Sequence, residues 1–423
     1  MFKVVTLTNG IKIAMDEMDS IRSVSFGIWV KNGSRNEMPS ENGISHFIEH
    51  MMFKGTDKRA AKDIADEMDA VGGQVNAYTT KEYTCYYTRT LDSHLYIALD
   101  VLSDMYLHSA FDEAEIKKEL NVITEEIDMY EDTPEETVHD LLQTRIWADN
   151  PLGFSVIGRK DTIVNFRRDT FKSYLDRHYS PENTVITLVG HFSPDEAVKR
   201  IEEAFGGFGG SGKDETPAPK PVYMPGISLK PKDIEQTHLC LGFPGIALGD
   251  NRAYDLTAMN TMFGGGMSSR LFQTIREENG LAYSVYSYMT PYIDTGLFTV
   301  YTGFNVSQAE DVIQLMFDVI NGFFTNKVTR EQLDKTREQL KSNFLLSLES
   351  TSSRMSSLGR SQLLLNRTLS DEEIVAKLDA VTLDSLYDIA KLVFDMDNVS
   401  MCVVGRLGDW DYEALLNSAK QRG

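Results

Sequence analysis

The sequence predicts an α+β protein of two homologous domains, each an antiparallel β-sheet that is covered by helices on one face. Three observations lead to this prediction. Strand patterns alternate with longer helical patterns throughout, one segment near the middle is rich in glycine and proline, and the halves on either side repeat each other. A chain of 423 residues with 42% hydrophobic residues also exceeds the size of one ordinary core.

The elements of the first half follow from their local patterns. Alternating apolar residues from Lys3 to Met15 predict two strands, and Asn9-Gly10 predicts the turn between them. A third strand is expected at 24–30. Further strands are expected at 74–80, 83–91 and 184–190, and helices at 41–55, 60–71, 95–107, 112–130, 135–147, 161–178 and 194–205.

The composition changes in the middle of the chain. Glycines crowd positions 206–212, and four prolines follow at 217–225. Such a segment is typical of a linker, so the sequence predicts domains at 1–210 and 226–423 joined by a linker at 211–225. The second domain is expected to contain strands at 237–243, 282–289, 296–303 and 399–405, and helices at 253–263, 270–278, 307–324, 329–348, 371–378 and 383–392.

The two halves repeat each other at a nearly constant distance. Tyr87-Thr88 precedes an expected helix, and Tyr301-Thr302 does so 214 positions later. The stretches 183–190 and 398–405 also match, at an offset of 215. A duplication of this length explains both the size of the chain and the position of the linker.

The helix expected at 41–55 carries a candidate metal motif. Asn42 is expected to cap its start and Gly55 to close its end. At about 100° per residue, one stripe of this helix is apolar, namely Ile44, Phe47, Ile48, Met51 and Met52. His46, Glu49 and His50 lie together on the opposite side.

Two imidazoles four positions apart can bind one metal ion, and the Glu before the second is placed to act as a base without binding the ion. The order H-x-x-E-H is that of an inverted zinc-protease motif. A His pair on the polar side of a helix more often only faces solvent, so a third ligand is needed. The second half has Asn260 at the position that corresponds to His46, and metal binding is expected in the first half only.

The helix expected at 112–130 offers the third ligand. Glu119 and Glu126 are seven positions apart and lie on one border of its apolar stripe, whereas Glu125 points away. Periodicity therefore favours Glu126 over Glu125. On spacing alone, an ordinary acidic rim remains an alternative.

The strand expected at 74–80 is polar enough to lie at the edge of its sheet. An edge beside a metal site can pair with an extended peptide. Asn76, Ala77 and Tyr78 are therefore candidate substrate-binding residues, and Thr79 continues the same edge.

Charge and composition exclude several classes of partner. A net charge of −21 argues against nucleic acid and anionic membranes and favours basic or neutral peptides, although acidity can also serve solubility alone. Cys85, Cys240 and Cys402 are expected to be buried free thiols. No apolar run reaches the roughly 18 residues of a membrane span, and no secretory signal is recognisable, so a cytoplasmic location is expected.

Four stretches resemble a known family over essentially the whole chain: 46–56, 72–79, 122–127 and 264–272. The chain is similar to the pitrilysin family of zinc metallopeptidases, the inverted zincins, in the branch of the mitochondrial processing peptidase β subunit and its short bacterial relatives. This resemblance implies one Zn²⁺ per chain, bound by His46, His50 and Glu126. It also implies that Glu49 is the general base and that Glu119 is a carboxylate outside the ligand set.

The resemblance also assigns a role to the second half. Arg276 and Tyr283 match a segment whose arginine and tyrosine reach the substrate. The chain is shorter than the long pitrilysin members, which implies that it acts as a homodimer.

The function expected is that of a zinc endopeptidase that cleaves peptides or unfolded segments inside a chamber formed by the two domains. The alternative is a noncatalytic scaffold or peptide-binding subunit of a larger assembly. A noncatalytic scaffold usually lacks the metal residues, whereas this sequence keeps His46, Glu49, His50 and Glu126. A peptide-binding subunit in which zinc is only structural would leave Glu49 without a task.

Overall fold

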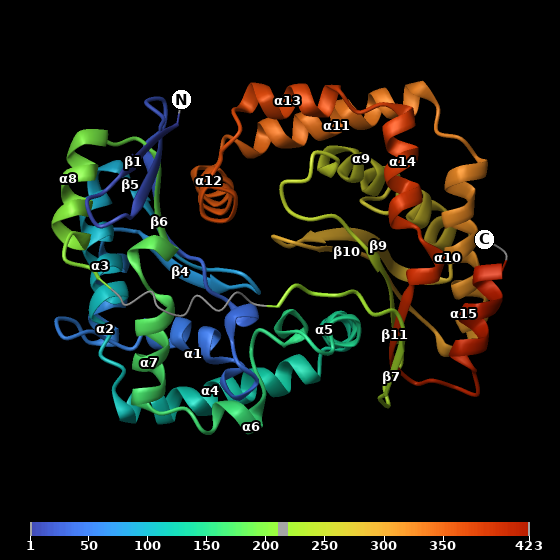
Figure 1. Cartoon of the computed structure of the whole chain (residues 1–423), viewed down its shortest axis with the longest axis horizontal. Helices are drawn as coiled ribbons and strands as arrows, with labels where there is room; N and C mark the ends of the chain where they lie inside the picture. The colour runs from blue at the N-terminus through green and yellow to red at the C-terminus, as the bar shows by residue number, and fades with distance from the viewer. Residues whose placement is uncertain (1, 210–218, 422–423) are drawn as a thin grey trace. The chain divides into compact units, whose positions relative to one another are not determined.

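The computed structural model of the chain describes residues 2–209 and 219–421 (Figure 1). The expected linker at 211–225 falls mostly outside the described residues, and positions 219–225 form neither helix nor strand.

The strands are β1 (Lys3–Thr6), β2 (Lys12–Glu17), β3 (Ser23–Val30), β4 (Gln74–Thr79), β5 (Thr84–Leu91), β6 (Thr184–Gly190), β7 (Ile227–Pro231), β8 (Thr237–Pro244), β9 (Ala282–Pro291), β10 (Gly296–Phe304) and β11 (Ser400–Gly405). The helices are α1 (Ile44–Met51), α2 (Ala61–Ala70), α3 (Leu95–His108), α4 (Glu113–Glu131), α5 (Pro134–Ile146), α6 (Lys160–Ile163), α7 (Arg168–His178), α8 (Pro194–Phe205), α9 (Ala253–Phe263), α10 (Ala309–Thr325), α11 (Arg330–Ser347), α12 (Thr351–Leu365), α13 (Asp371–Asp379), α14 (Leu383–Val393) and α15 (Tyr412–Gln421), and a π-type helix, η6, spans Phe272–Glu278.

The strands form two sheets with corresponding topologies. The first has the order β1-β2-β6-β3-β5-β4 and the second β7-β11-β8-β10-β9. All neighbours are antiparallel except β2 with β6 and β7 with β11, which are parallel. The antiparallel prediction therefore holds for every pair but one in each sheet. β6 and β11 enter their sheets after a run of helices, a connection long enough to permit parallel pairing.

The expected repeat is visible at matched positions of the two sheets. β6 and β11 both lie between a parallel and an antiparallel neighbour. They end at Gly190 and Gly405, whose φ angles of +133° and +136° are left-handed and nearly equal. Glycine is the residue that adopts this conformation without strain, so both copies end this strand in the same way.

The chain forms two compact units, each assembled from three segments. Unit 1 comprises 1–128, 154–219 and 345–370, and unit 2 comprises 129–153, 220–344 and 371–423. This division differs from the expected domains at 1–210 and 226–423, because α5 belongs to unit 2 and α12 to unit 1. One helix from the first half of the chain, α5, therefore packs in unit 2, and one helix from the second half, α12, packs in unit 1.

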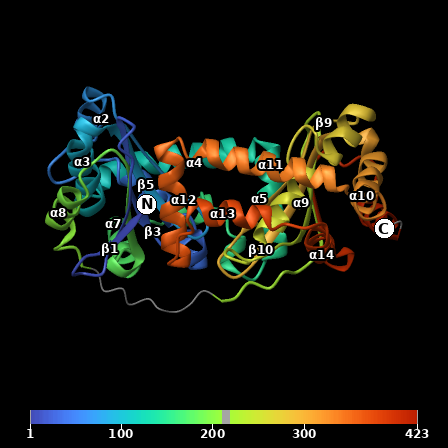
Figure 2. The same ribbon diagram turned by 90° about the horizontal axis from the view of Figure 1, so that it is seen from above.

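In unit 1, α12 covers the face of the sheet that α3 leaves open (Figure 2). Trp29 of β3 is fully buried on this face, and its indole Nε1 donates to Thr187 Oγ1 at 2.8 Å. A Cβ atom at Gly359 of α12 would lie 2.2 Å from the Trp29 ring. The helix can approach the sheet this closely because residue 359 has no side chain.

In unit 2, α5 has the corresponding position on β11 and β8, with α10 and α15 on the other side of the sheet (Figure 1). A Cβ atom at Gly242 of β8 would lie 2.8 Å from the Leu142 side chain of α5. Tyr292 Oη donates to Gln143 Oε1 at 2.8 Å. Both sheets thus carry a helix on their second face, whereas the sequence predicted helices on one face only.

Several expected elements differ in the structure. The helix expected at 161–178 is divided into α6 and α7, because the N–H of Arg167 turns to the Thr170 hydroxyl and starts a new helix there. α12, β7 and α15 were not expected from the sequence.

The state of the cysteines and the hydropathy of the helices were both expected from the composition. Cys85, Cys240 and Cys402 are free and buried, as predicted. None of the helices within 2–209 and 219–421 is long and apolar enough to cross a bilayer.

Candidate metal centre

α1 is anchored by its apolar stripe. Ile44, Phe47, Ile48 and Met51 are fully buried and Met52 is 1% exposed, which confirms the predicted stripe. Burial of these side chains holds the opposite side of the helix, with His46, Glu49 and His50, in one orientation.

The start of α1 is held by Glu37 and not by the expected Asn42 cap. The Glu37 carboxylate accepts from the N–H of Gly43 at 2.8 Å and of Ser45 at 2.9 Å. The Asn42 amide donates to the same carboxylate at 3.0 Å. Burial raises the pKa of Glu37 to about 7 even though these donors favour its charged form. A carboxylate suits this position because the free N–H groups of a helix start attract negative charge.

A second contact fixes where α1 begins. Gly43 has a φ of +95°, and a Cβ atom there would lie 2.7 Å from the Cα of Gly158. Gly158 has a φ of +82° and faces Gly43 in return. The two glycines permit a backbone contact that no larger residue allows.

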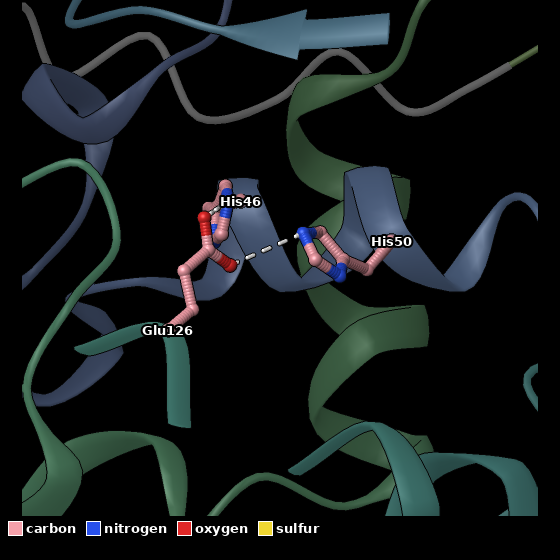
Figure 3. Close-up of side chains that lie close together, drawn as sticks. All are labelled: His46, His50 and Glu126. Carbon is pink, nitrogen blue, oxygen red and sulfur yellow. Dashed lines mark ion pairs between the residues drawn. The ribbon is translucent and has the colours of Figure 1, made fainter. Parts of the chain in front are cut away.

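His46, His50 and Glu126 converge on one point (Figure 3). His46 Nε2 lies 3.7 Å from Glu126 Oε1, and His50 Nε2 lies 3.6 Å from Glu126 Oε2. These distances are too long for hydrogen bonds. Two ligands of a tetrahedral zinc ion, each about 2.0 Å from the metal, are about 3.3 Å apart. Two imidazole nitrogens and one carboxylate oxygen are also a donor set that zinc prefers, so these residues fit the ion.

The structure places Glu126, and not its neighbour Glu125, beside the two histidines. Its carboxylate is half-buried and faces the two histidines, whereas Glu125 is exposed. Among the described residues, this is the one group of three or more His, Cys, Asp or Glu side chains with ligand atoms close enough to share an ion.

Glu119 lies one step outside this group. Its Oε1 is 2.8 Å from His50 Nδ1, and its Oε2 is 2.6 Å from Lys54 Nζ. Burial raises the pKa of Glu119, but the hydrogen bonds to His50 and Lys54 outweigh burial and lower it overall. The charged Glu119 accepts a hydrogen bond from a protonated His50 Nδ1, which leaves the lone pair of His50 Nε2, the nitrogen facing Glu126, available for a metal ion.

The two histidines have opposite electrostatic surroundings. Burial lowers the pKa of His46 to about 3, so its imidazole stays neutral, the form that binds metals. Burial also opposes charge on His50, but the Glu119 hydrogen bond and the charges of Glu126 and Glu49 raise its pKa overall. A metal cation bound between His46, His50 and Glu126 would replace the added proton of His50 as the positive charge that faces Glu126 and Glu49.

Glu49 lies beside the group without belonging to it. Its Oε2 accepts from Thr79 Oγ1 of β4 at 2.6 Å. Burial raises the pKa of Glu49, partly offset by the Thr79 hydrogen bond and by His50. A raised pKa makes this carboxylate a stronger base, which suits a group that takes up a proton and passes it on.

β4 is the last strand of its sheet, as the sequence predicted. Asn76 is exposed, and its Oδ1 accepts from the Ala77 N–H at 2.8 Å. The Tyr78 ring lies in an aromatic cluster with Trp29, Tyr83 and Tyr87, at centroid distances of 6.0 to 6.3 Å. The Tyr78 side chain is thus occupied in packing, and its backbone remains on the edge strand.

Arg276 and Tyr283 lie together in unit 2. The Arg276 guanidinium carbon lies 4.7 Å from the ring centroids of Tyr283 and of Phe272, and its Nε is 3.6 Å from Glu277 Oε1. Tyr283 is the second residue of the edge strand β9 and is 77% exposed. The pair is accessible to a ligand, although Arg276 also has the nearby Glu partner that an ordinary structural role would give it.

Sequence reasoning missed Glu37, Lys54 and the contact between Thr79 and Glu49. Lys54 follows His50 by one helical turn, a spacing that indicates proximity. Glu37 lies in an irregular segment, for which periodicity gives no signal.

The fold and these residues define a class of protein: two related units, one of which carries an inverted zinc-protease motif with a third ligand on a separate helix. Residues 12–160 match the family described as Insulinase (Peptidase family M16), and residues 165–340 match the Peptidase M16 inactive domain. The chain belongs to peptidase family M16.

Relatives agree with this assignment over most of their length. The chain is 44% identical to the uncharacterized zinc protease YmxG of Bacillus subtilis, covering 94% of this chain and 97% of that protein. It is 39% identical to the uncharacterized zinc protease SCO5738 of Streptomyces coelicolor, covering 96% and 89%.

Two solved structures share the fold. A protease from Helicobacter pylori has a TM-score of 0.87 at 21% identity, covering 96% of this chain and 99% of that chain. A peptidase M16 inactive domain from Pseudomonas fluorescens has a TM-score of 0.89 at 19% identity, covering 96% and 98%.

Proposed function

We propose that this protein is a zinc-dependent endopeptidase that hydrolyses peptides or unfolded segments. The observation that carries this proposal is the convergence of His46, His50 and Glu126 with Glu49 beside them. A site that only stored zinc would not need the half-buried Glu49 carboxylate next to its ligands. The names of the relatives as zinc proteases also support the proposal.

When bound, zinc supplies a Lewis acid that polarises the peptide carbonyl and makes a water molecule more acidic. Glu49 accepts a proton from the attacking water and then donates it to the amine of the leaving peptide. Thr79 holds the Glu49 carboxylate in place through its hydroxyl. Glu119 orients His50, and Lys54 keeps Glu119 charged.

The peptide is held in this proposal as an added strand along the segment Asn76, Ala77 and Tyr78 of β4, where the Ala77 backbone faces the free edge. Arg276 and Tyr283 bind substrate carbonyls from the second domain, and the two domains enclose the peptide in a chamber. The family resemblance and the accessibility of Tyr283 support this part of the proposal.

Partners and location complete the proposal. The resemblance supports two copies of the chain acting together, which sedimentation of the purified protein tests. The net charge of −21 supports peptides as ligands in place of nucleic acids or anionic membranes, and the enzyme is proposed to work in the cytoplasm.

The test is hydrolysis of unstructured fluorogenic peptides by the zinc-loaded full chain and by its Glu49→Gln variant. We expect the variant to keep its zinc and to lose roughly 10²- to 10⁴-fold in kcat/KM, because the base is removed while the ligands remain. Glu125→Gln, which removes an exposed carboxylate of α4, serves as the control and should hydrolyse normally.

Two results would count against the proposal. Turnover of Glu49→Gln within a few fold of the parent would remove Glu49 as the base. Peptide binding without hydrolysis by the zinc-loaded parent would instead support the noncatalytic, peptide-binding alternative.

A further inference from the structure

A pocket of about 470 Å³ lies in unit 1 where α2 ends and β4 begins. Its walls include Ala65, Met68 and Asp69 of α2, and Val75 and Asn76 of β4. The candidate metal ligands His46, His50 and Glu126 do not line it, and neither do Glu49 and Glu119. The pocket adjoins the free edge of β4, so its position bears on any peptide that pairs with this edge.

The backbone of β4 can be assigned residue by residue. The Thr80 N–H donates to the Tyr83 carbonyl, so this pair of the β4–β5 hairpin is hydrogen-bonded. Hydrogen-bonded and non-hydrogen-bonded pairs alternate in antiparallel strands. Val75, Ala77 and Thr79 therefore direct their N–H and C=O groups to the free edge. The Ala77 N–H confirms this direction, because it donates to the Asn76 side chain in place of β5.

A peptide that pairs with these outward groups passes both the pocket and the catalytic base. Thr79, at one end of the edge, donates to Glu49. Val75, four residues earlier, lines the pocket and lies about 13 Å away at 3.3 Å per residue. One side chain of the bound peptide, a few residues from the bond that is cut, is therefore placed to enter the pocket.

Asp69 supplies the chemical selectivity of the pocket. It is exposed in the last turn of α2, where that helix has no basic residue. Within the described residues, the Asp69 carboxylate has no hydrogen-bond or ion-pair partner. Negative charge at a helix C-terminus is unfavourable, so the local structure gives no reason for an aspartate there. A cation brought by a ligand supplies the missing partner.

The other walls suit the stem of a long basic side chain. Met68 is 1% exposed, and Val75 and the Tyr87 ring are half-buried, so they offer apolar surface below the rim. Lys and Arg commonly bury their methylene groups against such surface while the charged end stays at the rim. An acidic residue of the peptide would meet Asp69 and be repelled.

We propose that this pocket is a specificity subsite that receives a Lys or Arg side chain of a peptide bound along β4, with Asp69 as the selecting residue. The inference rests on the proposed peptidase function. It adds a preference for basic residues at one position relative to the cleavage site.

The experiment uses the zinc-loaded full chain with Glu49→Gln, so that peptides bind without being cut. The probes are fluorescein-labelled ten-residue peptides of Ala, Ser and Val that carry one Lys, Gln or Glu at successive positions. Binding is measured by fluorescence anisotropy at low salt. At one position we expect Lys to bind about three-fold more tightly than Gln, since an exposed charge pair has a small effect, and Glu to bind most weakly.

Added substitutions locate this preference. Asp69→Asn should remove the difference between Lys and Gln. Asp66→Asn removes the same charge one turn earlier in α2, from an aspartate that pairs with Lys62 and does not line the pocket, and should keep the difference. Ala65→Phe fills the pocket and should weaken Lys and Gln peptides alike at this position. Asp69→Asn should also leave the thermal midpoint unchanged or raise it, whereas loss of a structural residue lowers it.

The outcomes separate the subsite from the peptidase function. Equal binding of Lys and Gln peptides at every position, or equal losses in Asp69→Asn and Asp66→Asn, overturns the subsite. If the parent with Glu49 still hydrolyses these peptides, the proposed function stands. A Lys preference that Asp69→Asn removes, without hydrolysis by the parent, supports the subsite and overturns the peptidase. Absence of both binding and hydrolysis for all peptides overturns both.

Discussion

Units 1 and 2 follow the same path but differ on the polar side of one helix. In unit 1, α1 follows β3 and carries His46, Glu49 and His50. In unit 2, α9 follows β8 and has Asn260 in place of His46. Among the described residues of unit 2, no group of His, Cys, Asp or Glu has the spacing of a metal site.

The shared features of these helices show which part is structural. α9 buries Leu256, Met259 and Phe263, as α1 buries its own apolar stripe. The Asn260 Oδ1 accepts from Ser287 of β9 at 2.7 Å, and Glu49 accepts from Thr79 of β4 at 2.6 Å. Both helices are thus tied to their edge strand by one hydroxyl. The candidate metal ligands in unit 1 are an addition to a polar surface whose packing does not require them.

The largest expected effect is on zinc affinity, and it concerns the side of α4 that faces His46 and His50. Glu126→Gln should weaken zinc binding by more than about 100-fold, because it replaces a charged ligand, and even partners of ligands cost 10- to 100-fold. Glu125→Gln should bind zinc as the parent does, since Glu125 is exposed. Competition with a chelating dye measures both affinities. Equal losses from the two substitutions would refute the assignment of Glu126.

The next effect concerns the helix that unit 1 receives from the second half. Gly359→Ala should lower the free energy of unfolding by about 2 to 3 kcal/mol, because the added methyl group overlaps the buried Trp29 ring. An ordinary Gly-to-Ala change in a helix interior stabilises by about 1 kcal/mol. Urea unfolding measures whether Gly359→Ala lowers or raises the free energy of unfolding. Ser357→Ala, at an exposed position of α12, is the control. A more stable Gly359→Ala would mean that α12 lies farther from the sheet.

A smaller effect tests whether unit 2 takes part in catalysis although it lacks ligands. The double variant Arg276→Ala, Tyr283→Phe should lose about ten-fold in kcat/KM, since each side chain is proposed to supply a hydrogen bond to substrate. Its zinc content should not change. Arg252→Ala, which removes an exposed arginine of unit 2 that pairs with Asp250, is the matched control. Full activity of the double variant would restrict the site to unit 1.

The smallest effect concerns the helix that unit 2 receives from the first half. On α5, His139 contacts Tyr288 and Tyr286, and burial lowers its pKa from 6.5 to about 4. The unfolded chain therefore binds the proton first, and stability is lost as pH falls from 6.5 through 4. The loss is about 1 kcal/mol at pH 5.5 and at most about 3 kcal/mol at pH 4.

Urea midpoints at pH 7.5 and 5.5 measure this loss for the parent and for His139→Asn. The parent should lose about 1 kcal/mol more than the variant over this range. Identical pH dependence would show that His139 is charged or exposed in the folded protein.

The metal centre was predictable because most of its geometry is local. His46, Glu49 and His50 lie on two adjacent turns of one helix, and the helical period alone brings them together. The period of a second helix favoured Glu126 over Glu125, and the family resemblance then implied that Glu126 is the third ligand. The partners that hold these residues were not predictable in the same way, because Glu37 reaches α1 from an irregular segment and Thr79 reaches Glu49 from another strand.

The sequence by itself determined the two repeated halves, the metal motif and the polar edge strand, since each depends on the spacing of nearby residues. Only the tertiary structure decided that α5, from the first half of the chain, packs in unit 2 and that α12, from the second half, packs in unit 1. The segment of α12 is rich in serine and contains Gly359, a composition that argues against a helix when it is considered alone. It forms one because its small residues fit closely over Trp29, a contact between positions 330 residues apart that no local pattern records.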